Sequence, residues 1–181
     1  VKALLESTVF YHAWLYQGVG NVEVFLSYFK QRIEDNYKQL WNNDLENSSR
    51  ARTARLYCNF TYQPYLNIIK TEKIRTALSR YRLSAHRLEV EAGRWHKPES
   101  IPYNERKCKS CNSLEDEFHF LLECPLYSDM RKLYIKKYFW THPNMLKFVE
   151  LLASDNENTM KKLGLFLYKS FEERNKLYYL N

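Results

Sequence analysis

The sequence predicts a mostly α-helical protein that carries one small Cys/His knuckle. Apolar residues recur at intervals of three and four along several segments, which is the period of an amphipathic helix. Only four glycines and five prolines occur in 181 residues, which leaves few turns for a sheet-rich fold. Three of the four cysteines lie with a histidine in one short window. The length permits one domain with a substantial core, or two small units that pack together.

The N-terminal segment, residues 1–47, is expected to be helical. A first helix precedes the turn sequence Gly18-Val19-Gly20-Asn21. Asn21 suits the N-cap of a second, stronger helix, because apolar residues recur at helical spacing from Val22 to Leu40. That helix is expected to stop at Asn42-Asn43-Asp44, and a polar linker then places a boundary near Asn47.

The next segment, residues 48–100, holds the charge asymmetry of the chain. Between Ala51 and Lys97 there are ten basic and three acidic residues, a net charge of +7 that equals the formal net charge of the whole chain. Arginine dominates, and its guanidinium group matches phosphate geometry. Interleaved tyrosines, Phe60 and Trp95 suit stacking on bases. The candidate nucleic-acid-binding residues are Arg75, Arg80, Arg82, His86, Arg87 and Arg94.

A second interpretation of this basic segment stays open. The charges can form a solvated helix face over an aromatic core. Independently of this choice, the apolar spacing of Ile74, Leu78, Tyr81 and Ala85 predicts a helix from Thr71 to Leu83. His86 and His96 have no partner at metal-ligand spacing, so we expect them to cap, pack or contact phosphate.

The knuckle segment, residues 101–131, contains the spacing C-x2-C-x7-H-x4-C at Cys108, Cys111, His119 and Cys124. Two cysteines separated by two residues can hold one ion from a tight turn, and three thiolates with one imidazole complete a tetrahedral zinc site. Because all four positions are filled, we expect a structural Zn²⁺ site. The alternative is a set of ordinary buried cysteines beside a core or surface histidine.

The second half of the knuckle is expected to form a short helix from Leu114 to Glu123 that opens with a capping box. On a continuing α-helix, Cys124 would point about 140° away from His119. We therefore expect Cys124 where the helix breaks, just before Pro125.

The C-terminal segment, residues 132–181, is also expected to be helical. The predicted helices run from Ser128 to Trp140, from Met145 to Leu152, and from Met160 through Phe171. No stretch approaches the roughly 20 apolar residues needed to span a bilayer. Cysteines assigned to metal point to a reducing compartment. We therefore expect an intracellular protein, nuclear or cytoplasmic, without a membrane partner.

The residues of the knuckle and of the run before it also carry a family resemblance. RLSAHRLEVEAGR at residues 82–94, followed by C-x2-C and EDE-x-HFLL-x-CP at residues 108–125, resembles the C-terminal zinc-binding (CCHC) region of reverse transcriptases from non-long-terminal-repeat retrotransposons. The similarity covers Ser84 to about Arg131 and is looser from Thr53 to Leu78. It implies an accessory module that grips template RNA or target DNA, with an upstream reverse transcriptase domain as a further partner.

The chain departs from this family in its catalytic motifs. It contains neither a Tyr-x-Asp-Asp polymerase motif nor a Pro-Asp nuclease arrangement after the knuckle, so we do not expect this chain alone to be an enzyme. It could be the tail of a polyprotein, a decayed copy, or a piece captured for another role. The favoured hypothesis is a zinc-stabilised nucleic-acid-binding module; the alternatives are a zinc-stabilised helical scaffold that binds protein and, third, an enzyme.

Overall fold

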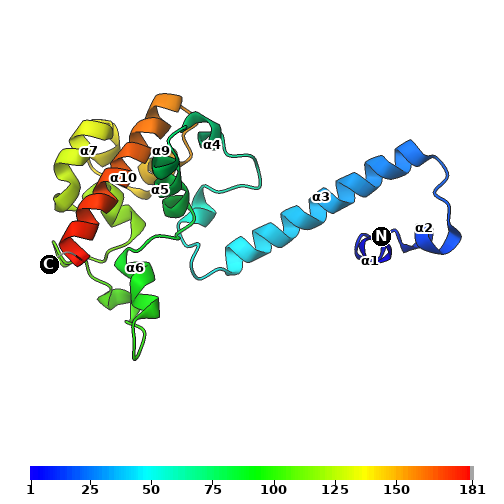
Figure 1. The fold of residues 1–181 in the computed structure, drawn as a ribbon, viewed down its shortest axis with the longest axis horizontal. Helices are drawn as coiled ribbons and strands as arrows, with labels where there is room; N and C mark the ends of the chain where they lie inside the picture. Colours follow the sequence, from blue (N-terminus) through cyan, green and yellow to red (C-terminus); the bar gives the residue numbers. More distant parts are fainter. Residues whose placement is uncertain (180–181) are drawn as a thin grey trace. The chain divides into compact units, whose positions relative to one another are not determined.

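The computed structural model describes residues 1–179 and divides the chain into two compact units, Val1–Ser48 and Ser49–Asn181. Both units are helical (Figure 1). Within residues 1–179 there is no strand, and one isolated antiparallel bridge joins Lys107 and Leu114. The predicted mostly α-helical fold is therefore confirmed. The division lies beside the boundary predicted near Asn47, and residues beyond it form a single compact unit.

The helices of the first unit are α1 Lys2–Ser7, α2 Tyr11–Tyr16 and α3 Val22–Asn47. The helices and helical turns of the second unit are η1 Ala54–Leu56, α4 Tyr65–Ile68, α5 Glu72–Arg82, α6 Glu89–Ala92, η2 Gly93–Trp95, η3 Tyr103–Glu105, η4 His119–Glu123, η5 Pro125–Tyr127, α7 Ser128–Tyr134, α8 Lys137–Trp140, α9 Met145–Leu152 and α10 Glu157–Tyr179. None of the helices in the described part of the chain is both long enough and apolar enough to cross a bilayer.

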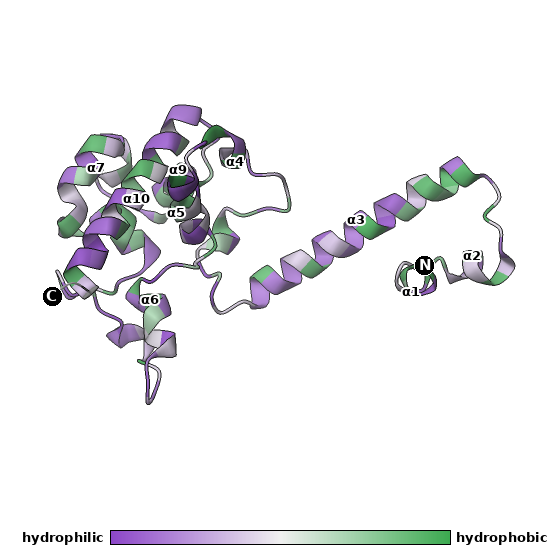
Figure 2. Cartoon of the chain, viewed as in Figure 1, coloured by the Kyte–Doolittle hydropathy of each residue, from purple (hydrophilic) through white to green (hydrophobic). Residues whose placement is uncertain are grey.

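The first unit is built on α3. The Asn21 side chain caps this helix by accepting a hydrogen bond from the Val24 amide at 3.1 Å, as predicted. The helix continues to Asn47, past the stop predicted at Asn42-Asn43-Asp44. Phe10, which precedes α2, packs edge-on against Phe25 and Phe29 of α3. None of the residues of α3 is buried, and hydrophobic and hydrophilic residues alternate along it (Figure 2).

The second unit has a continuous hydrophobic core around α10. This helix packs against α4, α5 and α7, and it contributes the fully buried residues Leu163, Phe166 and Leu167. A Cβ built at Gly164 would lie 2.7 Å from Cγ2 of Ile74, so only glycine permits this close approach of α10 to α5. The core continues into the knuckle through Phe120, which stacks on Phe171 of α10 with ring centroids 4.7 Å apart.

Most predicted helices of this unit are confirmed. The helix predicted from Thr71 to Leu83 is α5, and the helix from Met145 to Leu152 is α9. The single helix predicted from Ser128 to Trp140 is wrong, because Ile135 adopts an extended conformation between α7 and α8. The Ile135 carbonyl accepts a hydrogen bond from the Trp140 indole at 3.1 Å, so the break leaves this carbonyl satisfied.

Candidate metal centre

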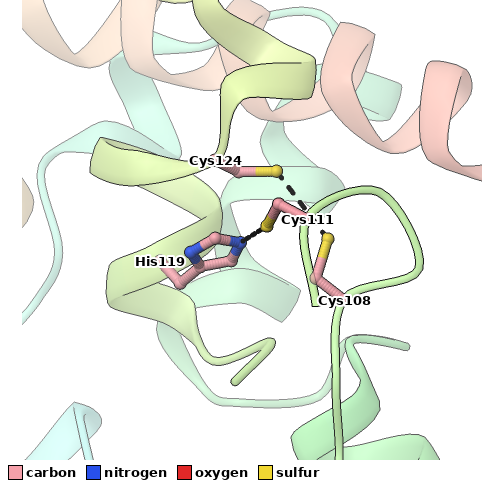
Figure 3. Close-up of side chains that lie close together, drawn as sticks. All are labelled: Cys108, Cys111, His119 and Cys124. Atoms are coloured by element: carbon pink, nitrogen blue, oxygen red, sulfur yellow. Dashed lines mark hydrogen bonds between the residues drawn. The ribbon is translucent and has the colours of Figure 1, made fainter. Parts of the chain in front are cut away.

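Four side chains converge in the second unit on one point between a loop and a helical turn. Cys108 and Cys111 lie on the loop, and His119 and Cys124 lie at the two ends of η4 (Figure 3). Their ligand atoms all lie within 4.8 Å of one another. The Sγ atoms of Cys108 and Cys124 are 3.8 Å apart, and Sγ of Cys111 lies 3.2 Å from Nε2 of His119. This cluster could bind a metal ion.

The loop that carries the first two ligands is a tight turn held by its own backbone. The Cys108 amide donates to the Ser113 carbonyl at 2.7 Å, and the Asn112 amide donates to the Cys108 carbonyl at 2.8 Å. Asn112 has φ of 62°, a left-handed conformation that asparagine tolerates better than most residues. The turn thus directs both thiols to the same side of the chain.

The second pair of ligands depends on a π-helical turn. The Cys124 amide donates to the His119 carbonyl at 2.8 Å, an i to i+5 bond that is wider than the α-helical one. The wider turn brings Cys124 back over His119, where a continuing α-helix would have pointed it away. The break at Cys124 before Pro125 was predicted and is confirmed.

The start of the predicted knuckle helix is wrong. Residues 114–116 are not helical, because Leu114 forms the bridge with Lys107. The helical turns begin at Glu117, and Asp116 caps them by accepting a hydrogen bond from the His119 amide at 2.8 Å. At the other end, the buried Arg131 of α7 donates to the carbonyls of Leu121 and Cys124. Both ends of the turn are therefore held by side chains.

Hydrogen bonding within the cluster favours a thiolate. The hydrogen bond between the Cys108 and Cys124 sulfurs, together with His119, lowers the pKa of Cys108 to about 3, although burial opposes this. The same bond raises the pKa of Cys124. Burial is the largest single effect on the pKa of His119 and lowers it, but the hydrogen bond and negative charge of Cys108, together with the carboxylates of Glu123 and Asp116, outweigh burial and raise it. A deprotonated cysteine is the form that binds metal.

The outer nitrogen of His119 also has a partner. Its Nδ1 lies 3.7 Å from a carboxylate oxygen of Glu123, while Nε2 faces the cluster. A carboxylate beside the outer nitrogen orients a histidine ligand and fixes its tautomer. His119 is therefore arranged as a metal ligand through Nε2.

The knuckle is attached to the basic segment through Glu117. Its carboxylate accepts hydrogen bonds from Ser84 at 2.7 Å and from His86 at 2.9 Å, and its carbonyl accepts one from Tyr81 at 2.5 Å. Burial raises the pKa of Glu117, but the hydrogen bond and electrostatic attraction of His86, together with the bond from Ser84, outweigh burial and lower it. The carboxylate is therefore ionised at neutral pH, and it holds the end of α5 on the knuckle.

A second attachment joins the knuckle to α10 through Arg174. This fully buried guanidinium donates to both carboxylate oxygens of Glu115, at 2.9 and 2.6 Å. The Tyr178 ring packs against this guanidinium, and its centroid lies 3.8 Å from Cζ of Arg174. The Tyr178 hydroxyl donates a hydrogen bond to Glu115 at 3.0 Å. The same hydroxyl accepts a hydrogen bond from the backbone amide of Lys109, which lies in the loop between Cys108 and Cys111. We call Glu115, Arg174 and Tyr178 the knuckle clamp.

The knuckle clamp was not predicted, although the spacing along α10 indicates part of it. Met160, Leu163, Leu167 and Phe171 follow the apolar face of α10 at helical spacing, and Arg174 occupies the next position on that face. A charged residue in such a position needs a buried partner. The sequence did not identify Glu115 as that partner, because it lies 59 residues away.

The six candidate nucleic-acid-binding residues do not share one environment. Arg80 and Arg87 are exposed. Arg75 is half-buried and donates to the Ile69 carbonyl, and Arg94 pairs with Glu91 at 2.9 Å.

Arg82 and His86 correct the prediction, because neither side chain is available to a surface ligand. Arg82 is 5% exposed and donates to the Leu152 carbonyl and to Gln63. The His86 side chain is 1% exposed and is bonded to Glu117. Their charge or polarity in a basic segment predicts a surface role, but both side chains form their hydrogen bonds inside the unit.

A groove of about 810 Å³ lies between α5, residues 85–87 and α10. The charged side chains that line it are Lys73, Arg80, Arg87, Glu72 and Glu172. Tyr168 and Phe171 of α10 add aromatic surface. We call this the basic groove, because it gathers the exposed Arg80 and Arg87 beside two aromatic rings.

Comparisons of the chain with protein-family models, with curated proteins and with solved structures found no match.

Proposed function

We propose that this chain is a zinc-stabilised module that binds nucleic acid without catalysing a reaction, similar in role to the C-terminal region of a retrotransposon reverse transcriptase. Template RNA and target DNA are the ligands that this resemblance implies, and an upstream polymerase domain is the implied partner. The observation that carries the proposal is the basic groove, in which exposed arginines lie beside aromatic rings.

Zinc is the metal that the ligand set favours. Three thiolates and one imidazole form a typical structural zinc set, and zinc–sulfur bonds of about 2.3 Å imply sulfur atoms about 3.8 Å apart in a tetrahedron. The Cys108 and Cys124 sulfurs are 3.8 Å apart. The 3.2 Å between Cys111 and His119 needs to widen by only a few tenths of an ångström. The residues therefore fit zinc.

Nucleic acid is the partner that the basic groove favours. Guanidinium groups contact phosphate oxygens in a forked geometry, and aromatic rings stack on bases. Arg80 and Arg87 are exposed and line the groove with Lys73. Glu72 and Glu172 reduce the charge of the groove, so we expect affinity to depend strongly on the arginines.

The test is a salt titration of RNA and DNA binding. Replacing both Arg80 and Arg87 by Ala should weaken binding across sequences and lower the slope of log K against log salt by about one to two units. The matched control replaces Lys132 and Lys136, two exposed lysines outside the groove, so that it removes the same charge. If only the lysine variant loses binding, the nucleic-acid-binding surface lies on α7 and the residues that follow it. Salt-insensitive association with a protein would instead support an interaction scaffold.

A further inference from the structure

We infer that Trp95 forms a stacking site for an unpaired nucleobase, so that this module prefers single-stranded over fully paired nucleic acid. The inference rests on the proposed function and specifies the form of its ligand. Trp95 ends η2 and is 69% exposed. An indole left this open on a folded unit lacks the packing role that most tryptophans have.

The indole borders a hollow that continues the basic groove. The hollow has a volume of about 400 Å³, which is within the range of small-ligand pockets. It shares Ala85, His86 and Arg87 with the basic groove. A strand that follows the groove would therefore reach Trp95 next.

The charge around the hollow suits a base attached to phosphate. Glu91 is 5% exposed and is paired with Arg50 at 3.2 Å and Arg94 at 2.9 Å. Arg87 is exposed and lines the hollow. Two guanidinium groups thus pair with one carboxylate and a third lines the hollow, and this excess of positive charge favours an anionic ligand over a cation that could also bind an aromatic ring.

Arg50 adds a second planar group to the same site. Its guanidinium carbon lies over the Trp95 ring, 5.8 Å from the centroid. Guanidinium planes and aromatic rings are the two surfaces on which proteins stack splayed-out bases. Both kinds of surface line this hollow, one from Arg50 and one from Trp95.

The backbone below Trp95 is held rigidly by the knuckle. Arg106, which precedes the metal-binding loop, donates to the carbonyls of Val90 at 2.6 Å and Ile101 at 2.9 Å. The Ile101 amide donates to the Gly93 carbonyl, and a Cβ at Gly93 would lie 2.8 Å from the Arg106 side chain. A preorganised indole loses little conformational entropy on binding.

A stacking site distinguishes unpaired from paired bases. Within a duplex both faces of each base are covered by its neighbours, whereas an unpaired base can turn outward and stack on a side chain. Phosphate contacts alone, by contrast, are available in both forms. A preference for single strands should therefore depend on Trp95, while binding to duplex should depend on the arginines.

The experiment compares the zinc-loaded 181-residue chain with three variants on two ligands. The ligands are a single strand of about 12 nucleotides, within the range of simple single-strand sites, and a longer duplex of mixed sequence. The variants are Trp95→Ala, Trp95→Phe and, as control, Tyr62→Ala, which removes an aromatic residue that is 62% exposed and lines neither hollow nor groove.

We expect Trp95→Ala to weaken single-strand binding about 5- to 150-fold, which corresponds to one stacked base. Trp95→Phe should retain most of the affinity, Tyr62→Ala should retain all of it, and duplex affinity should stay within about twofold. Single-strand binding should also quench tryptophan emission in the parent more than in Trp95→Phe.

The outcomes distinguish failure of the Trp95 stacking site from failure of the proposed nucleic-acid-binding function. Equal single-strand binding by the parent and Trp95→Ala, or an equal loss on duplex and single strand, overturns the stacking site. If the Arg80 and Arg87 variant still loses affinity in that case, the proposed function stands. A parent protein that binds neither ligand overturns the proposed function and the stacking site together.

Discussion

Helix α3 and the knuckle segment, residues 101–131, show opposite relations between local pattern and burial. Helix α3 spans 26 residues with regular apolar spacing and a good N-cap, yet none of its residues is buried. The knuckle consists of short turns, a bridge and one π-helical turn. It nevertheless buries all of residues 119–122, together with Glu115 and Glu117. Local helical preference therefore does not identify the parts of this chain that make the core.

Among substitutions outside the Cys3His cluster, we expect loss of the knuckle clamp to lower the free energy of unfolding the most. Arg174→Met would leave the Glu115 carboxylate buried without its main partner, so we expect a loss of about 3 to 5 kcal/mol in the free energy of unfolding. The control is Lys176→Met on the same helix, where the exposed side chain pairs with Glu173. Urea unfolding of both zinc-loaded variants measures the effect. Equal stability of the two variants would show that the clamp does not stabilise the unit.

A matched pair of leucines compares the two units directly. Leu163 of α10 is fully buried, and Leu40 of α3 is 59% exposed. Leu163→Ala should cost roughly 2 to 5 kcal/mol because it leaves a cavity, whereas Leu40→Ala should stay within about 0.5 kcal/mol. The midpoint of urea unfolding, followed by circular dichroism, measures both. A larger loss for Leu40→Ala would mean that α3 has a buried partner.

Sequence reasoning was accurate where the physical cause is local. The N-cap at Asn21, the limits of α5 and the break at Cys124 depend on residues within one or two helical turns. The cluster of Cys108, Cys111, His119 and Cys124 was predictable because their spacing is typical of residues that hold a single ion.

It failed where a partner outside the predicted helix or segment decides. The bridge between Lys107 and Leu114 replaces the first turn of the predicted helix. Arg82 is buried because the Leu152 carbonyl, 70 residues away, accepts its hydrogen bond. Partners at such separations leave no periodic signal in a single sequence.

The central claim is that a zinc ion at the Cys3His cluster organises the second unit, whereas α3 folds without it. Structural zinc contributes about 10 to 16 kcal/mol of apparent binding free energy in isolated zinc fingers, so removal of the ion should unfold at least residues 105–130. Cys111→Ser should lose the metal, and Cys58→Ser, which alters the one cysteine outside the cluster, should keep it.

The most direct measurement is hydrogen exchange before and after chelation, with zinc quantified in the same samples. We predict one zinc per chain, a large rise in amide exchange across residues 105–130 after chelation, and unchanged exchange in α3. Negligible zinc in the purified protein, or unchanged exchange across residues 105–130 after the metal is removed, would contradict the claim.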